Sequence, residues 1–197
     1  MGAKPSFLIA RQYETTGSWY VWHQSLSANN SYVLLNSTNA QNSGSTVWAS
    51  TDMTSTVISD TASGHWGTSQ KMLYYAWTDI PGLQKFGSYV GNNNDDGPFV
   101  ELGFRPSIIL IFNLAGGNWY LYDHVRPGYN VTPNRLYPNL NNVEDTGDTA
   151  NTLDILSNGF KIRQDHAGIN AAGGTFIYMT WAEAPTFNLY GAQSNAR

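Results

Sequence analysis

Short apolar runs separated by Gly, Asn and Ser recur along the whole chain, and no amphipathic helix longer than two turns is indicated. In 19–23 and 72–77 the alternation places aromatic residues on both faces of the segment. Such strands are covered on both sides, as in the middle of a β-sandwich. We therefore expect an all-β fold, with strands at 7–11, 19–23, 31–35, 56–59, 71–78, 108–112, 119–123, 134–137, 153–156, 159–163 and 175–183.

Turn signals divide these strands. Ser157-Asn158-Gly159 predicts a hairpin in which Asn-Gly supplies positive φ, and Gly116-Gly117 predicts a similar turn. The clearest loop is 91–98, and it separates a first half, 1–92, from a second half, 93–197. Segments 86–90 and 99–102 are candidate strands beside this loop. If they pair across the halves, the two halves form one continuous body.

The two halves repeat one pattern. KPSFLIARQYETTGSWYVW at 4–22 corresponds to RPSIILIFNLAGGNWYLY at 105–122, and KMLYYAWTDIP at 71–81 corresponds to TFIYMTWAEAP at 175–185. A repeat of this length identifies the folding unit. We expect two tandem repeats, each an antiparallel β-sandwich unit of lectin or jelly-roll type, packed together. Aromatic residues present at equivalent positions of both halves are expected to serve packing. These are Trp19, Tyr20, Trp22, Tyr74 and Trp77, with Trp119, Tyr120, Tyr122, Tyr178 and Trp181.

Composition narrows the function classes. Charged residues make up only 12% of the chain, while aromatic residues make up 14%. The net charge is −4 and the basic residues form no run, so we expect no nucleic-acid partner. The chain has no Cys, which excludes disulfides, thiolate zinc sites and cysteine nucleophiles. The longest apolar run, 108–112, is too short to span a membrane, so we expect no membrane partner.

Catalytic motifs are weak. There is no G-x-S-x-G nucleophile elbow, and the four His lack metal-ligand spacing. Asp79 and Glu183 could form a glycosidase pair, but they occupy nearly equivalent ends of the repeated strand. That equivalence favours structural roles, in which the carboxylates accept turn amides or pair with an Arg. We therefore expect no enzymatic activity.

One loop carries hard-oxygen ligands. In 92–97, Asp95 and Asp96 are candidate Ca²⁺ ligands among Asn side chains. The spacing is not that of an EF-hand, and Asn and Asp also populate metal-free turns. We favour an ordered turn without metal, keep Ca²⁺ as the alternative, and expect no other cofactor.

Two tryptophans lack a counterpart in the other half. Trp48 and Trp66 lie in the Ser/Thr/Gly-rich segments STVWAS and SGHWGTS. Exposed Trp in such loops can stack on sugars or seat a partner protein. The alternative is that both rings plug the ends of the sandwich.

Several motifs together resemble a known family. FGSYVGNNNDDGPFVELGFRPSIILI (86–111), NWYLYD (118–123), LYPNL (136–140), ILSNGFKIR (155–163) and GGTFIYMTWAEAP (173–185) are similar to a duplicated β-domain of marine and freshwater bacteriophages, cyanophages included. In that family the domain belongs to tail-fibre-like and other virion structural proteins. The resemblance implies a virion component without known catalysis, and it supplies no site residues.

The resemblance and the composition lead to one expectation. The protein is a non-enzymatic structural protein of a phage virion, exposed on the particle surface. It serves as a tail-fibre or adsorption module, or as a capsid decoration (cement) protein, and docks other virion proteins or a host-surface glycan. A homo-oligomer, with a trimer favoured, suits symmetric sites on a particle. The alternatives are a polysaccharide depolymerase and a secreted lectin-like sugar-binding protein.

Overall fold

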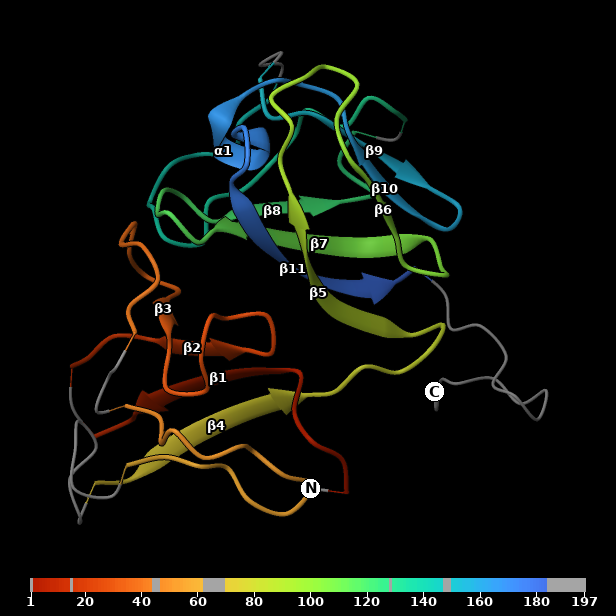
Figure 1. Ribbon diagram of the computed structural model, residues 1–197. Coiled ribbons are helices and arrows are strands. Elements are labelled where there is room, and N and C mark those ends of the chain that lie inside the picture. Colours follow the sequence, from red (N-terminus) through yellow and green to blue (C-terminus); the bar gives the residue numbers. More distant parts are fainter. Residues whose placement is uncertain are drawn as a thin grey trace.

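The computed structural model describes residues 2–14, 16–43, 47–61, 70–127, 129–146 and 150–183. Within these ranges the chain is all-β, with three antiparallel sheets and one four-residue helix (Figure 1). The elements are β1 (Phe7–Gln12), β2 (Tyr20–His23), β3 (Val33–Leu34), β4 (Met72–Trp77), β5 (Gln84–Val90), β6 (Phe99–Glu101), β7 (Pro106–Asn113), β8 (Tyr120–Asp123), β9 (Leu153–Leu156), β10 (Gly159–Ile162), α1 (Ala167–Asn170) and β11 (Thr175–Ala182). No helix in the described part of the chain is long and apolar enough to cross a membrane.

The sheets form three layers. The first sheet has the order β3-β2-β1-β4, the central sheet β5-β11-β7-β8, and the third sheet β6-β10-β9. Figure 1 shows the central sheet between the other two. Each contact between layers is a hydrophobic core, so the protein has two cores that share the central sheet.

Alternation along the central strands explains this sharing. On β11, Ile177 and Met179 enter the core with the first sheet, while Phe176 and Tyr178 enter the core with the third sheet. The other central strands divide their side chains in the same way, because successive residues of a strand point to opposite faces. The near-continuous apolar runs of β7 and β11 therefore reflect a sheet covered on both sides.

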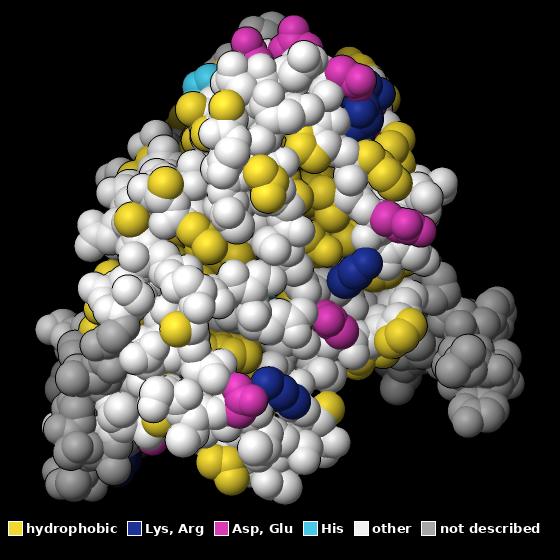
Figure 2. Space-filling view, in the orientation of Figure 1, with side chains coloured by type: hydrophobic (Ala, Val, Ile, Leu, Met, Phe, Trp, Pro, Cys, Tyr) yellow, Lys and Arg dark blue, Asp and Glu magenta, His cyan; other side chains and the backbone are white. Residues whose placement is uncertain are grey.

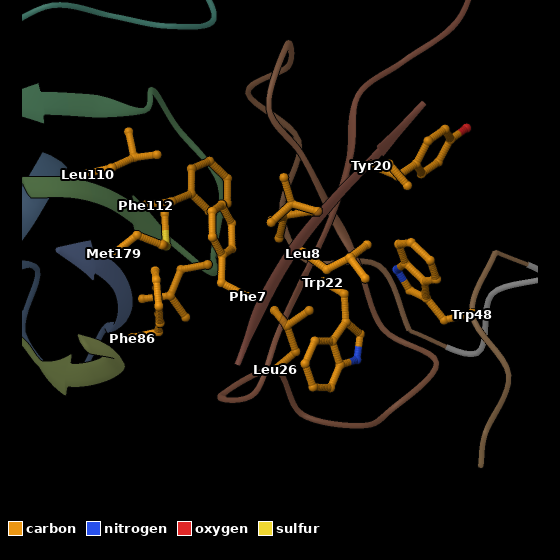
Figure 3. Close-up of a cluster of buried hydrophobic side chains, with 14 of the residues drawn as sticks. Phe7, Leu8, Tyr20, Trp22, Leu26, Trp48, Phe86, Leu110, Phe112 and Met179 are labelled. Carbon is orange, nitrogen blue, oxygen red and sulfur yellow. The ribbon is translucent and has the colours of Figure 1, made fainter. Parts of the chain in front are cut away.

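The first sheet is also covered on both sides over most of its area. All four residues of β2 are buried, which confirms the expectation for 19–23. In Figure 3, Phe86, Phe112 and Met179 lie on one side of β1, and Trp22 and Trp48 lie on the other. The loops between β2 and β4 thus complete the first core.

For β4 the expectation of cover on both sides is wrong. Leu73 and Tyr75 are 40% and 45% exposed. The reason is position, because β4 is the outermost strand of the first sheet among the described residues. Its aromatic pattern resembles that of a central strand, yet its neighbours cover it only in part.

The segments of the sequence repeat pair with the same register. Phe7 lies opposite Trp77 in the first sheet, and the equivalent residues Ile108 and Trp181 lie opposite each other in the central sheet. Likewise, Ala10 pairs with Tyr20 and Ile111 pairs with Tyr120. The order β2-β1-β4 therefore corresponds, strand by strand, to the order β8-β7-β11.

Segment 84–90 joins the halves. It forms β5, which precedes the loop at 91–98 and pairs with β11 over its whole length, from Gln84 opposite Trp181 to Val90 opposite Thr175. Pairing thus crosses the boundary placed after residue 92, as expected for one continuous body. The boundary itself remains a prediction.

Local structure differs from expectation at three places. Residues 56–59 and 134–137 form no strand, although Arg135 and Leu136 make isolated bridges. The turn after β9 forms at Ser157-Asn158, but neither Asn158 nor Gly159 has a positive φ. Gly159 is needed for another reason: a Cβ there would lie 2.1 Å from the carbonyl oxygen of Val100 on β6.

Candidate functional site

The structure places Trp48 in the first core. Its side chain is fully buried in the same cluster as Trp22, Leu26 and Met53 (Figure 3). The ring is therefore buried and not exposed to a partner, so the candidate partner contact at Trp48 is replaced by the alternative of a packing role. The outer face of the first sheet is apolar and needs a cover, and Trp48 supplies much of it. Trp66 lies outside the described residues.

The loop at 91–97 is an ordered turn held by Asn170. The backbone N–H of Asn92 donates to Asn170 Oδ1, and the N–H of Asn93 donates to the Asn170 carbonyl, both at 2.9 Å. Asn170 Nδ2 in turn donates to the carbonyl of Asn94 at 2.9 Å. Asn170 is fully buried, so its amide is a fixed support for the loop.

The two candidate calcium ligands bind protein groups. Asp95 Oδ1 accepts the N–H of Asp165 at 3.2 Å, and the carboxylate of Asp96 lies 2.7 Å from Lys161 Nζ. The hydrogen bond from Lys161 lowers the pKa of Asp96. Among the described residues, no three His, Asp or Glu side chains gather into a possible metal site. Calcium binding by this loop remains the untested alternative to the favoured metal-free turn.

Asp79 and Glu183 have the structural roles expected from their equivalence. Asp79 Oδ1 accepts the N–H of Phe86 at 2.8 Å, and its Oδ2 accepts Gln24 Nε2 at 3.1 Å. Glu183 pairs with Arg105, and that hydrogen bond lowers the pKa of the Glu183 carboxyl. One carboxylate therefore caps a turn amide and the other binds an arginine.

The longest connection in the second half, residues 124–152 between β8 and β9, contains no strand or helix among its described residues. Connections in compact domains usually have about 4–6 residues, and much longer ones are commonly functional or disordered. Hydrogen bonds fix several side chains of this connection, which favours a functional loop over a disordered one. We call its described residues 124–127 and 129–146 the 124–146 surface.

A buried arginine is the main anchor. Arg135 is 1% exposed, and its guanidinium donates to Asp145 Oδ2 at 2.7 Å and to the hydroxyl of Tyr137 at 2.8 Å. It also donates to the carbonyls of Pro133, at 3.1 Å, and Ala150, at 2.8 Å. These four bonds from one guanidinium hold distant points of the connection together.

A second anchor fixes the connection to the third sheet. Asn130 accepts the N–H of Ile155 at Oδ1 and donates from Nδ2 to the Ile155 carbonyl, both at 2.9 Å. This pair mimics the backbone pairing that a neighbouring strand would make beside β9. The hydroxyl of Tyr122 adds a bond to the Asn151 carbonyl at 2.7 Å.

Two hollows lie on the 124–146 surface. The larger is a groove of about 600 Å³, lined by Asn118, Tyr137, Asn142, Val143, Glu144, Asp145 and Thr146. The smaller is a pocket of about 150 Å³ beside Arg105, His124 and Tyr129. An ion pair between Arg126 and Glu144, at 3.4 Å, joins the two loop segments that form them.

The same surface concentrates exposed apolar side chains. Tyr129 and Val143 are 81% and 86% exposed, among the highest values for large apolar residues in the described chain. Val125, Val131 and Leu140 are also exposed. Such side chains on an anchored loop are typical of a contact surface. In the groove, amides and carboxylates surround one aromatic ring, so it offers both hydrogen bonds and an apolar face.

A comparison with protein families identifies this chain's family. The family model named domain of unknown function (DUF7483) matches residues 1–185. The chain belongs to the DUF7483 family. No curated protein and no solved structure matches the chain.

The DUF7483 match covers every strand in the described part of the chain, since β11 ends at Ala182. It also covers the first half, the second half as far as residue 185, and the 124–146 surface. The DUF7483 domain therefore includes all three sheets, and the shared central sheet lies within one family unit.

Sequence reasoning did not find the residues that form this surface. The sequence predicts a strand at 134–137, and that prediction gives no indication of the buried role of Arg135. The composition of residues 124–152 argues against strands, because the segment has three prolines, many Asn and few strand-like runs. That composition indicates a long loop but not its anchors.

Proposed function

We propose that this protein is a non-enzymatic structural component of a phage virion, exposed on the particle surface, and that it docks its partner through the 124–146 surface. The observation that carries the proposal is the anchored long loop. A loop held by Arg135 and Asn130 presents its exposed side chains in one arrangement. Preorganisation of this kind reduces the entropy lost on binding.

The surface chemistry agrees with such a role. Charged side chains are few and scattered over the face in Figure 2, so hydrogen bonding and shape govern contact more than long-range attraction. The resemblance to duplicated β-domains of phage virion proteins supports a place on the particle, either on the tail fibre or as a capsid decoration protein. A homo-oligomer, with a trimer favoured, fits either position.

We also propose that the two halves are tandem copies of one β-sandwich unit. The matching registers of β2-β1-β4 and β8-β7-β11 support this. The third sheet and α1 then belong to the second copy, and loops cover the corresponding face of the first sheet.

A glycan is the better of the two partner classes for the groove. Tyr137 offers an aromatic ring whose hydroxyl is fixed by Arg135 and Asp145. Asn118 and Asn142 line the same groove with side-chain amides, which can donate to and accept from sugar hydroxyls. The non-enzymatic assignment is supported by Asp79 and Glu183, whose carboxylates are engaged in structural bonds.

Quantitative mass spectrometry of purified particles tests the virion assignment. A copy number comparable to that of the major shell protein supports capsid decoration, and a much lower number supports a place on the tail. Absence from particles contradicts the proposal.

Glycan-array binding tests the groove. Asn142→Ala removes a side chain that the fold does not use, and loss of one hydrogen bond of about 1 kcal/mol weakens binding about fivefold. Val57→Ala, at an exposed position on the first half, is the matched control and leaves binding unchanged. If the wild-type protein bound no glycan on a broad array, glycan docking would be excluded and a protein partner would remain.

A further inference from the structure

The groove on the 124–146 surface has a negatively charged wall. Glu144 and Asp145 line it, and none of the described residues that line it is Lys, Arg or His. The two side chains are 35% and 29% exposed, so each carboxylate is partly open to a ligand in the groove. The sign of this wall restricts which partners the groove can accept, because like charges at short distance repel.

Two arginines beside the groove balance this wall only in part. Arg135 donates to Asp145 Oδ2 at 2.7 Å and so neutralises that carboxylate. Arg126 is shared between two acids, because its Nε donates to Asp123 while its Nη1 lies 3.4 Å from Glu144 Oε2. Three carboxylates therefore share two guanidiniums, and the longer of the two contacts of Arg126 leaves the unbalanced negative charge on Glu144.

Other basic side chains on this surface do not supply the missing charge. Arg105 and His124 belong to the smaller pocket, and both lie beside Glu183, which forms an ion pair with Arg105 and is 3.5 Å from His124 Nε2.

The carboxylate of Glu144 is held in place. Asn134 Nδ2 donates to Glu144 Oε1 at 3.1 Å, while Oε2 is the oxygen on the side of Arg126. Both partners belong to the anchored connection, so the charge has a fixed position in the groove. A fixed charge binds a cationic group with little loss of side-chain entropy.

Asn118 gives the groove a hydrogen-bond donor of fixed orientation. Asn139 Oδ1 accepts the N–H of Trp119 at 3.0 Å, so Asn139 Nδ2 is the end that donates to Asn118 Oδ1, at 3.1 Å. Because this bond uses Asn118 Oδ1, the donor Nδ2 is the end that a ligand meets. The groove therefore combines an unbalanced carboxylate with an amide donor that suits a sugar hydroxyl.

We infer that the groove selects an amino sugar, whose ammonium group binds Glu144 and whose hydroxyls bond to Asn118, and that it rejects acidic sugars. This inference rests on the glycan docking proposed above and adds a charge preference to it. An ammonium group donates three hydrogen bonds and carries the positive charge that the wall lacks. A neutral sugar gains hydrogen bonds only, and a sugar carboxylate would face Glu144 and Asp145.

Binding of three oligosaccharides of equal length tests this preference. The probes are a glucosamine oligomer, its N-acetylated form and a uronic acid oligomer, in a mildly acidic buffer that keeps the amine protonated. We expect the amine form to bind about threefold more tightly than the acetylated form, the effect typical of a partly exposed ion pair. The uronic acid form binds most weakly, and added salt reduces the differences because it screens exposed charges.

Two variants assign the preference to Glu144. Glu144→Gln keeps an acceptor for Asn134 and removes the charge, so the preference for the amine form disappears. Arg126→Met removes the guanidinium that Glu144 shares, so the amine form binds about twofold more tightly. Damage to the loop would weaken binding in both variants, so the opposite directions distinguish a charge effect from a structural one.

Glu101→Gln is the matched control. It makes the same change in net charge on β6, while the 124–146 surface is bonded to β9 at the other edge of the third sheet. The control therefore leaves the preference for the amine form unchanged.

The outcomes separate this inference from the proposed function. Glycan binding without preference for the amine form, or a preference that survives in Glu144→Gln, overturns the selection of amino sugars and leaves glycan docking intact. Tightest binding of the uronic acid form has the same meaning. Binding of no glycan, among these probes or on a broad array, overturns the inference together with glycan docking and leaves a protein partner.

Discussion

His23 is a buried imidazole that links the first sheet to the central sheet. Its Nδ1 accepts the N–H of Ser25 at 3.1 Å, so the ring proton lies on Nε2, which donates to the Tyr178 carbonyl at 3.3 Å. Burial lowers the pKa of His23 to about 4, although the bond to Tyr178 opposes the shift. Protonation would place a second hydrogen between Nδ1 and the Ser25 N–H.

We predict that stability falls as the pH falls from about 6.5 to 4. In this range the unfolded state binds a proton at His23 and the native state does not, so the loss reaches about 3 kcal/mol near pH 4. Chemical denaturation across this range measures it. His23→Gln keeps a donor for Tyr178 and removes the titrating group, so its stability profile is flatter. A wild-type profile as flat as that of the variant would contradict the assignment.

Trp48 provides a second prediction for a single residue. Trp48→Ala removes a fully buried indole from the first core and lowers the free energy of unfolding by about 3–5 kcal/mol. Val57→Ala, at an exposed position on the same covering loops, changes it by less than about 0.5 kcal/mol. Urea unfolding compares the two. Similar small effects would show that Trp48 does not support the core.

At the scale of elements, the connection between β8 and β9 depends on side chains rather than on a strand ladder. Arg135 lies in the segment 134–137, for which the sequence predicts a strand, but its bonds run to loop carbonyls and to Asp145. The sequence of the segment does not distinguish a strand from an anchored loop, because it records neighbours along the chain only. Sequence alone therefore predicts most strands correctly and this segment incorrectly.

We predict that Arg135→Met loosens this connection more than it weakens the sheets. Removing the guanidinium deletes its bonds to the carbonyls of Pro133 and Ala150 and its ion pair with Asp145, which keeps only the bond from the Tyr137 hydroxyl, at a cost of about 3 kcal/mol. Limited proteolysis within 138–146 becomes faster while the sheets keep their circular-dichroism signal. Arg126→Met is the matched control, since Arg126 makes ion pairs at the protein surface and such pairs contribute little. Equal proteolysis of both variants would contradict the anchoring role.

At the scale of the whole molecule, the two halves share their cores. The first core combines Phe7 and Leu8 of β1 with Phe86 of β5, Phe112 of β7 and Met179 of β11. The ring of Phe7 stacks on that of Phe86, with centroids 5.5 Å apart. Neither half can bury these side chains alone.

We therefore predict that fragments 1–92 and 93–197, produced separately, give no cooperative thermal unfolding. Fragment 1–92 would expose the apolar face of its sheet, and fragment 93–197 would lack β5 beside β11. Mixing the fragments restores the transition, as measured by near-ultraviolet circular dichroism. A cooperative transition in either fragment alone would show that the halves are independent domains.

The sequence by itself determined most of the strand segments, the repeat and its register, the positions of the turns at Gly116-Gly117 and Ser157-Asn158, and the structural roles of Asp79 and Glu183. These depend on local periodicity and on equivalence between segments, which can be read along the chain. Tertiary structure alone decided that Trp48 is buried, that β5 pairs with β11, that β4 lies at an edge, and that Arg135 anchors a loop. Each depends on which distant segments meet, because burial and pairing are set by spatial neighbours rather than by sequence neighbours.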